Sequence, residues 1–278
     1  MKIMAKTLSI TALLIVITSA LFSSVDLTKS PIQYAEAKIG SPVNLDAGSC
    51  NMLSGNWDKQ NSICRLLPSI SPYSTSVLKN GLNIPSGSGI EIRTGATLII
   101  PSNSQLTGTG FLSNYGMIDN RNTFTFSGVL DNIRNGTQSS GVITNEASGI
   151  FTSYSTNFSN LQGATVHNIG IMKNYGIITN GVSGPYVLGP SIIDDGTFAN
   201  FGTITNNFNG KIMILNSVGT GINNYGTITN SGKITVSNSG GVGINNSGTI
   251  NNYGTIYQCI GTIIGIITGI QPVTSGCP

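Results

Sequence analysis

Apolar and polar residues alternate in short segments through most of the chain, and most segments end in asparagine or glycine. Residues 202–206 and 226–230 both read Gly-Thr-Ile-Thr-Asn. An extended backbone would point the isoleucine of each segment to one side and its two threonines to the other. Short alternating runs bounded by glycine, asparagine or proline are typical of β-strands. Because no helical periodicity competes after about residue 38, the pattern predicts an all-β protein.

The segments recur at a fixed interval toward the C-terminus. Gly226 and Gly232 are repeated 22 residues later by Gly248 and Gly254. Such self-similarity indicates a solenoid, because each coil must stack on the next to bury its apolar side. We expect a single β-solenoid of about eight coils over residues 81–256, with spacers of variable length forming loops on one side.

Two structural details follow from the repeated unit. Its isoleucines are expected to stack as one interior column: Ile118, Ile143, Ile178, Ile204, Ile228 and Ile250. Asparagine and glycine at the segment ends are expected to supply left-handed backbone angles at the corners. Asparagine side chains repeated in every coil are also expected to form a hydrogen-bonded ladder.

The first 37 residues differ from the rest of the chain. Lys2 and Lys6 precede an apolar run over residues 8–22, and a polar stretch then ends in Ala35-Glu36-Ala37. This order is typical of a secretory signal peptide with a small-x-small cleavage site. The alternative is a retained N-terminal anchor, which would bring the protein to a membrane. Either way, we expect the remainder to be secreted, extracellular or at the cell surface.

Four cysteines lie as two pairs at the two ends of the mature chain. Cys50 and Cys64 flank Trp57 at equal spacing within an expected N-terminal cap of residues 38–80. Cys259 and Cys277 bracket an expected apolar C-terminal cap of residues 257–278. In an oxidising compartment, disulfides that close the two caps are the simplest interpretation. Metal binding is disfavoured because the chain has no Cys-x-x-Cys and a single histidine.

The apolar C-terminal segment has a second interpretation. Gly261, Gly265 and Gly269 follow one another at intervals of four residues, as in membrane helices that contact each other. The segment is short for a span and rich in β-branched residues, which favours a closing hairpin or last coil. Its apolar character also makes self-association through this end an expectation.

Composition narrows the partners. Only 8% of the residues are charged and the formal net charge is +3, so the chain lacks the basic stripe that binds a phosphate backbone. We therefore expect no nucleic-acid partner. Nothing in the chain calls for a cofactor or a metal.

A family resemblance follows from three features together. These are the Cys-Trp-Cys segment, the stretch SGSGIEIRTGATLIIPSN beginning at Ser86, and units such as NNYGTITNSGKI beginning at Asn223. Together with a leader, they resemble secreted microbial surface proteins with GATLxIP and NxGTIxN repeats. The resemblance implies a right-handed parallel β-helix of the pectate-lyase-like kind. That architecture serves lyases, hydrolases, adhesins and filaments alike.

Candidate catalytic residues are few. Asp194-Asp195 is similar to the clustered aspartates of β-helix hydrolases, but the accompanying basic signature is missing and His167 stands alone. A lyase would need several carboxylates around calcium. The acids considered for this purpose, if they align across coils, are Asp119, Asp131 and Glu146. We expect a non-enzymatic protein, with a polysaccharide lyase or hydrolase as the alternative.

Three surface features are candidates for binding or modification. Aromatic residues at the centre of Asn-x-Gly are expected to form a stripe that contacts glycans, or else to stack as structural spacers: Tyr115, Tyr175, Phe201, Tyr225 and Tyr253. Pairs of threonines suggest an ice-binding face as a remote alternative: Thr203, Thr205, Thr227 and Thr229. Asn135 and Asn157 match the N-glycosylation pattern.

These observations lead to one functional hypothesis. We expect a secreted β-solenoid that acts through its surface, as an adhesin-like or structural component. Its expected partners are surface glycans, other envelope proteins or further copies of itself. We also expect functional variation to lie in the irregular spacers, such as residues 181–195, or in the tail after Ile256.

Overall fold

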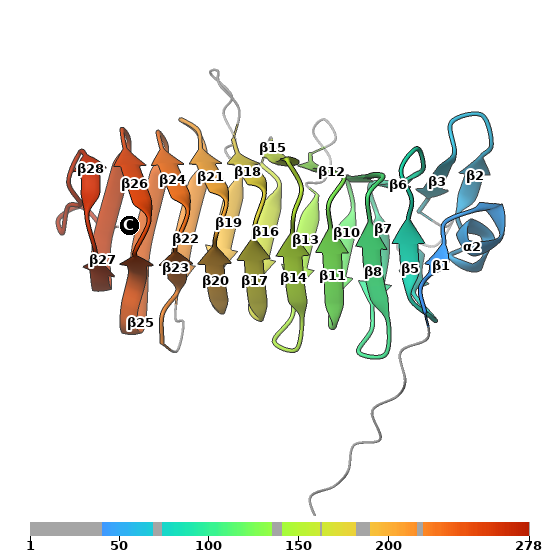
Figure 1. Cartoon of the computed structure of the whole chain (residues 1–278), viewed down its shortest axis with the longest axis horizontal. Coiled ribbons are helices and arrows are strands. Elements are labelled where there is room, and N and C mark those ends of the chain that lie inside the picture. The colour runs from blue at the N-terminus through green and yellow to red at the C-terminus, as the bar shows by residue number, and fades with distance from the viewer. Residues whose placement is uncertain are drawn as a thin grey trace, which may run out of the picture. The chain divides into compact units, whose positions relative to one another are not determined.

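The computed structural model describes residues 41–68, 74–134, 141–161, 163–181, 190–215 and 219–277, without the side chains of 238–240. The expected leader lies outside these residues. The described chain is an all-β parallel solenoid of about eight turns, which confirms the fold class expected from the repeat (Figure 1).

Each full turn contributes one strand to each of three stacks. The first stack contains β4 (Ser74–Val77), β7 (Ala96–Ile100), β10 (Met117–Asn120), β13 (Val142–Asn145), β16 (Thr165–Asn168), β19 (Ser191–Asp194) and β22 (Lys211–Leu215). The second contains β1 (Val43–Asn44), β5 (Leu82–Ile84), β8 (Gln105–Gly108), β11 (Thr123–Phe126), β14 (Ile150–Ser153), β17 (Ile171–Asn174), β20 (Thr197–Asn200) and β23 (Ile222–Asn224). Two long strands, β25 (Lys233–Asn246) and β27 (Thr255–Ile264), continue the first stack, and β25 also pairs with β23 of the second.

The third stack forms a separate sheet. Its members are β2 (Asn56–Asp58), β3 (Ile63–Leu66), β6 (Gly89–Ile92), β9 (Phe111–Asn114), β12 (Val129–Ile133), β15 (Asn157–Leu161), β18 (Ile177–Asn180), β21 (Thr203–Asn206), β24 (Thr227–Asn230), β26 (Thr249–Asn252) and β28 (Ile267–Gly269). All its pairings are parallel except the β2–β3 hairpin.

Alternating burial along the strands builds the core between the stacks. The isoleucines at the centre of Thr-Ile-Thr are fully buried and their threonine neighbours are partly exposed, as period-2 alternation requires. The expectation of one isoleucine column was wrong in its connectivity. Ile118 and Ile143 pair with each other in the first stack, whereas Ile178, Ile204, Ile228 and Ile250 form a column in the third. The core therefore has a separate interior column for each stack.

The repeat interval is confirmed by the strand register. Thr227 pairs with Thr249 and Lys233 with Thr255, each 22 residues on. The expected left-handed angles occur at glycines such as Gly95 and Gly181, but not at Gly226 or Gly248 and not at any asparagine of the described residues. A Cβ on Gly226 would instead lie 2.0 Å from the carbonyl oxygen of Gly202 in the preceding turn. Glycine is required there by the close approach of successive turns.

Disulfides lie near both ends of the solenoid. Cys50–Cys64 joins the helix α2 (Ala47–Met52) to β3, and Trp57 on β2 packs against the core. Cys259–Cys277 ties β27 to the C-terminal tail. Both pairs agree with the expected disulfides.

The C-terminal segment forms part of the last turn. The glycines spaced by four, Gly261, Gly265 and Gly269, all have φ between 89° and 100°. Gly261 lies within β27, Gly265 follows β27 and Gly269 ends β28, so their spacing belongs to extended chain and not to a helix. Among the described residues no helix has the length and apolar character needed to cross a membrane.

Candidate functional surfaces

Buried asparagines occupy the corners of the solenoid and bond to one another from turn to turn. In the third stack, each side-chain amide donates to the side-chain oxygen of the next asparagine at 2.7–2.8 Å. The members of this ladder are Asn114, Asn132, Asn160, Asn180, Asn206, Asn230 and Asn252, all fully buried. Since buried amides must find partners, each ladder links successive turns. The expected asparagine ladder is confirmed.

Two further ladders follow the other stacks. In the second stack the ladder runs through Asn174, Asn200, Asn224 and Asn246. In the first stack it runs through Asn120, Asn145 and Asn168 and ends at a carboxyl group, Asp194. The next residue in register after Asp194 is Ile214, which offers no side-chain partner.

Asp194 is therefore an acid in an asparagine position. Its side chain is fully buried, its Oδ1 accepts from the Asn168 amide at 2.7 Å, and its Oδ2 has no hydrogen-bond partner of good geometry among the described residues. Burial raises the pKa of Asp194 to about 7, against the lowering effect of the Asn168 hydrogen bond. The group is thus held near the boundary between its protonated and charged forms at neutral pH.

Asp195 points away from the core, unlike its neighbour. Its carboxylate lies 2.8 Å from Nε2 of His167, and both side chains are about one-third exposed. Asp195 also lines a shallow surface depression with Gly170 and Thr197. Because Asp194 is buried and Asp195 is outside, the two carboxylates do not converge on one point as the catalytic alternative would require.

The other acids considered as calcium ligands do not form one group. Asp119 lies in the first stack beside Arg121, and Glu146, which follows the neighbouring strand β13, also interacts electrostatically with Arg121. Asp131 lies in the third stack, where burial raises its pKa. Across the part of the chain that the structure describes, no three His, Cys, Asp or Glu side chains come together as metal ligands.

Four aromatic rings stack along one corner, between the second and third stacks. Ring centroids are 4.9 Å apart for Tyr154–Tyr175 and for Tyr175–Phe201, and 5.0 Å apart for Phe201–Tyr225. The interplanar angles are 7–12°, so each ring covers the face of its neighbour. Sugar rings bind aromatic faces, but both faces of the inner rings, Tyr175 and Phe201, are covered by their neighbours in this aromatic row.

The row differs in membership from the expected stripe. Tyr175, Phe201 and Tyr225 belong to it, but Tyr115 and Tyr253 lie at the other end of the third-stack strands, where their amides bond to the carbonyls of Ile92 and Asn230. Tyr115 and Tyr253 lie in the same Asn-x-Gly motif as the members of the row. Because the motif occurs at more than one corner, it could not tell the two groups apart. Tyr154 was missed because Ser-Tyr-Ser replaces the Asn-x-Gly motif there.

The outer face of the third stack carries ordered threonines next to this row. Parallel register aligns Thr203, Thr227 and Thr249 in one column, and Thr179, Thr205 and Thr229 in the other. From β15 to β28 this stack contains no Asp, Glu, Lys or Arg, whereas the other two carry Lys173, Lys211 and Lys233. The pairs of threonines in the sequence had indicated an array over two coils. The strand register adds Thr179 and Thr249 from the two adjoining coils. We call the outward residues of β18, β21, β24 and β26 the threonine face.

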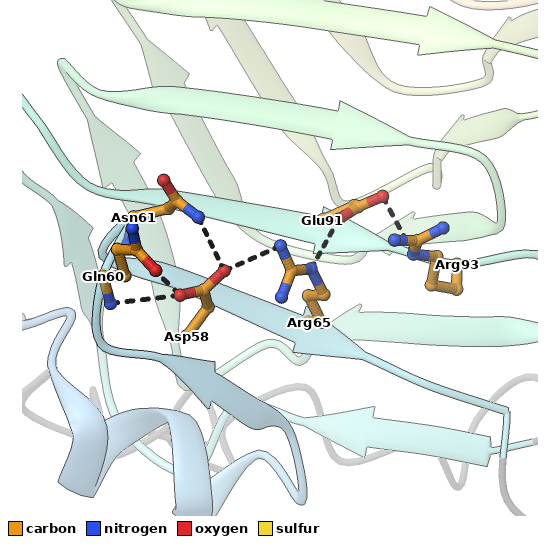
Figure 2. Close-up of polar contacts among 6 residues, drawn as sticks. All are labelled: Asp58, Gln60, Asn61, Arg65, Glu91 and Arg93. Atoms are coloured by element: carbon orange, nitrogen blue, oxygen red, sulfur yellow. Dashed lines mark hydrogen bonds and ion pairs between the residues drawn. The ribbon is translucent and has the colours of Figure 1, made fainter.

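Charged residues gather at the N-terminal end instead. Arg65 contacts Asp58 at 2.9 Å and Glu91 at 3.1 Å, and Arg93 lies 2.8 Å from Glu91 (Figure 2). Asn61 donates to Asp58, and this hydrogen bond is the main cause that holds the pKa of Asp58 below its usual value. The contacts join β2, β3 and β6, so this network fastens the hairpin to the first turn.

The two glycosylation motifs differ in what can be said of them. Asn157 is exposed at the start of β15, where its side chain accepts from Ser159. Asn135 lies outside the described residues, as does most of the spacer 181–195.

No family model matches the chain, and neither the curated proteins nor the solved structures contain a significant match. The parallel β-solenoid is therefore established by the strand pairing alone.

Proposed function

We propose that the protein is a secreted, non-enzymatic β-solenoid that acts through its surface, as an adhesin-like or structural component outside the cell. The observation that carries the proposal is the threonine face, a flat and uncharged sheet surface bordered by the aromatic row. A surface of this kind offers many hydroxyls and apolar edges to an extended ligand, without a pocket. Two disulfides support an oxidising, extracellular location.

The proposed partner is a surface glycan. Aligned threonines repeat at about 4.8 Å between strands and roughly 6.7 Å along a strand, which gives a regular set of hydrogen-bonding groups. The stacked rings add their edges and one exposed end at Tyr225. We also propose that the protein belongs with the secreted microbial surface proteins that carry GATLxIP and NxGTIxN repeats. This part of the proposal is supported by the sequence motifs alone.

Binding of the full chain to a glycan array and to insoluble polysaccharides tests this function. The double variant Thr205→Lys/Thr229→Lys places two charges in the threonine face, and we expect at least tenfold weaker binding. Asn223→Lys, on the outer side of the second stack, is the matched control and should bind like the wild type. The double variant Tyr175→Ala/Tyr225→Ala measures how much the aromatic row contributes to glycan binding.

Two results would contradict the proposal. Equal binding by the face variant and the control would remove the threonine face from any role. Release of reducing or unsaturated sugars from polyuronides by the purified protein would favour the enzyme alternative.

A second candidate function is ice binding, and the specific observation that favours it is the six-threonine array in register over four strands. A flat set of hydroxyl and methyl groups at fixed spacing can order water at an ice surface. Inhibition of ice recrystallisation by the wild type, lost in Thr205→Lys/Thr229→Lys and kept in Asn223→Lys, would support it. No inhibition at high protein concentration would end this candidate.

A further inference from the structure

The two ends of the solenoid differ in how their strand edges are treated. At the C-terminal end, β28 pairs with β26 on one side and with no described strand on the other. β27 pairs with β25, and its outer edge receives only a short bridge from Val273 to Tyr257. Unpaired edges are templates for pairing with another chain.

The surroundings of this open edge are apolar, and its own strands carry no charged side chain. The last charged residue before it is Lys233, whose Nζ lies 4.5 Å from the ring centroid of Tyr257 on β27. Large exposed side chains encircle the last turn: Ile260, Ile264, Ile266, Ile270 and Val273. Ile266 is the most exposed of them, at 82%. No residue after Lys233 is Asp, Glu, Lys or Arg. Proteins that stay monomeric commonly place charges on such edges, and this one places none.

The N-terminal end is built in the opposite way. Helix α2 and the β2–β3 hairpin lie across it (Figure 1), and Asp58, Arg65 and Glu91 form their ion network there. Lys59 and Lys79 add further charge to the same end. This end therefore does not offer an open, uncharged edge that would complement the C-terminal one.

We infer that two copies of this chain associate tail to tail through the last turn. The uncharged edge is complementary to itself, and a two-fold axis across the end would set each edge strand antiparallel to one of the partner. Each copy presents the same arrangement of strand edges, so an edge that lies on the two-fold axis meets its own counterpart. Such an isologous contact closes at two copies, with the isoleucines of both last turns buried against each other.

The contact is independent of the proposed glycan surface. The threonine face lies on the side of the third stack, and dimer formation leaves it open on both copies. An experiment that finds no glycan binding therefore does not count against the dimer. An experiment that finds no dimer does not count against glycan binding.

Sedimentation equilibrium of the full chain, over a wide concentration range, tests the inference. We expect a species of twice the monomer mass for the wild type. Ile260→Lys/Ile266→Lys should raise the dissociation constant at least tenfold, since both side chains are exposed in the monomer and the substitutions leave the core intact. Phe208→Lys is the matched control, because Phe208 is 79% exposed but lies along the rod, and it should remain dimeric.

A second variant separates tail-to-tail from head-to-tail contact. Met52 at the N-terminal end is 62% exposed and lines a small pocket with Val43 and Val77. Met52→Lys should leave the dimer unchanged. Polymers that grow with concentration and are blocked by Met52→Lys would overturn the inference in favour of an open filament. A monomeric wild type at all concentrations would also overturn it, as would a dimer insensitive to Ile260→Lys/Ile266→Lys, or a monomer that binds lipid vesicles through the same isoleucines.

Discussion

Asn168 donates a 2.7 Å hydrogen bond to Asp194, and that bond ends the asparagine ladder of the first stack with a buried acid. Asparagine and aspartic acid have nearly the same shape, so the acid fits the corner. The side-chain amide of asparagine carries its hydrogens at every pH, whereas the carboxyl group of aspartic acid carries one only when it is protonated. The position therefore couples the stability of the solenoid to pH.

Replacing the acid by its amide removes that coupling. The pKa of Asp194 is raised from 3.8 to about 7 in the folded chain, so the folded state holds a proton that the unfolded state has lost between these values. Wild-type stability should fall as pH rises from about 4 to about 7, on the order of 1 kcal/mol per pH unit. Asp194→Asn should remove this contribution to the slope and be more stable than the wild type at pH 8.

Denaturant unfolding at several pH values measures both profiles. Asp195→Asn, which leaves the buried carboxyl in place, should retain the wild-type slope. Parallel profiles for the wild type and Asp194→Asn would show that the buried carboxyl is not the source of the pH dependence.

The third-stack ladder should be sensitive to loss of a single member. Asn206 accepts from Asn180 and donates to Asn230, each at 2.7 Å. Asn206→Ala leaves buried groups without partners on both sides and should lower the free energy of unfolding by about 2 to 4 kcal/mol. Asn251→Ala, an outward asparagine of the same stack two turns away, should change it by less than about 0.5 kcal/mol. Similar losses for the two variants would contradict a structural role of the ladder.

The cost of replacing a corner glycine by alanine should depend on why glycine is needed at that position. Gly226→Ala would place a Cβ 2.0 Å from the Gly202 carbonyl oxygen, and separating the turns should cost about 3 kcal/mol, at the upper end of typical overpacking. Gly87 has a φ of 83° and nothing within 4 Å of the added carbon. Gly87→Ala should therefore cost only backbone strain, about 1 to 2 kcal/mol. Thermal unfolding of the two variants gives the comparison, and the reverse order would refute the close-approach explanation.

The aromatic row should contribute to stability as well as to the surface. Phe201 stacks on Tyr175 and Tyr225, so Phe201→Ala removes two ring contacts and should cost about 1 to 3 kcal/mol. Phe208→Ala, with the ring mostly in solvent, should be nearly neutral. If Phe201→Ala unfolds like the wild type, the stacked rings serve recognition alone.

The sequence alone was sufficient for the local features of this protein. Alternation within Thr-Ile-Thr determined which side of each strand is buried, and the 22-residue recurrence determined the register of the last regular turns. Asparagine at the end of most repeat segments was enough to predict the ladder, because a buried amide repeated from turn to turn finds its partner in the next turn. The two disulfides could likewise be predicted, since the two cysteines of each pair are close together in the sequence.

Only the tertiary structure decided which corner each residue occupies. Successive ladder members are separated by 22 residues between Asn230 and Asn252, but by 26 between Asn174 and Asn200. With spacers of unequal length, spacing in the sequence does not identify the stack to which a segment belongs. Hydrogen-bond register between turns does so, and it separated Tyr115 from Tyr175, added Tyr154 to the aromatic row and buried Asp194 while leaving Asp195 outside.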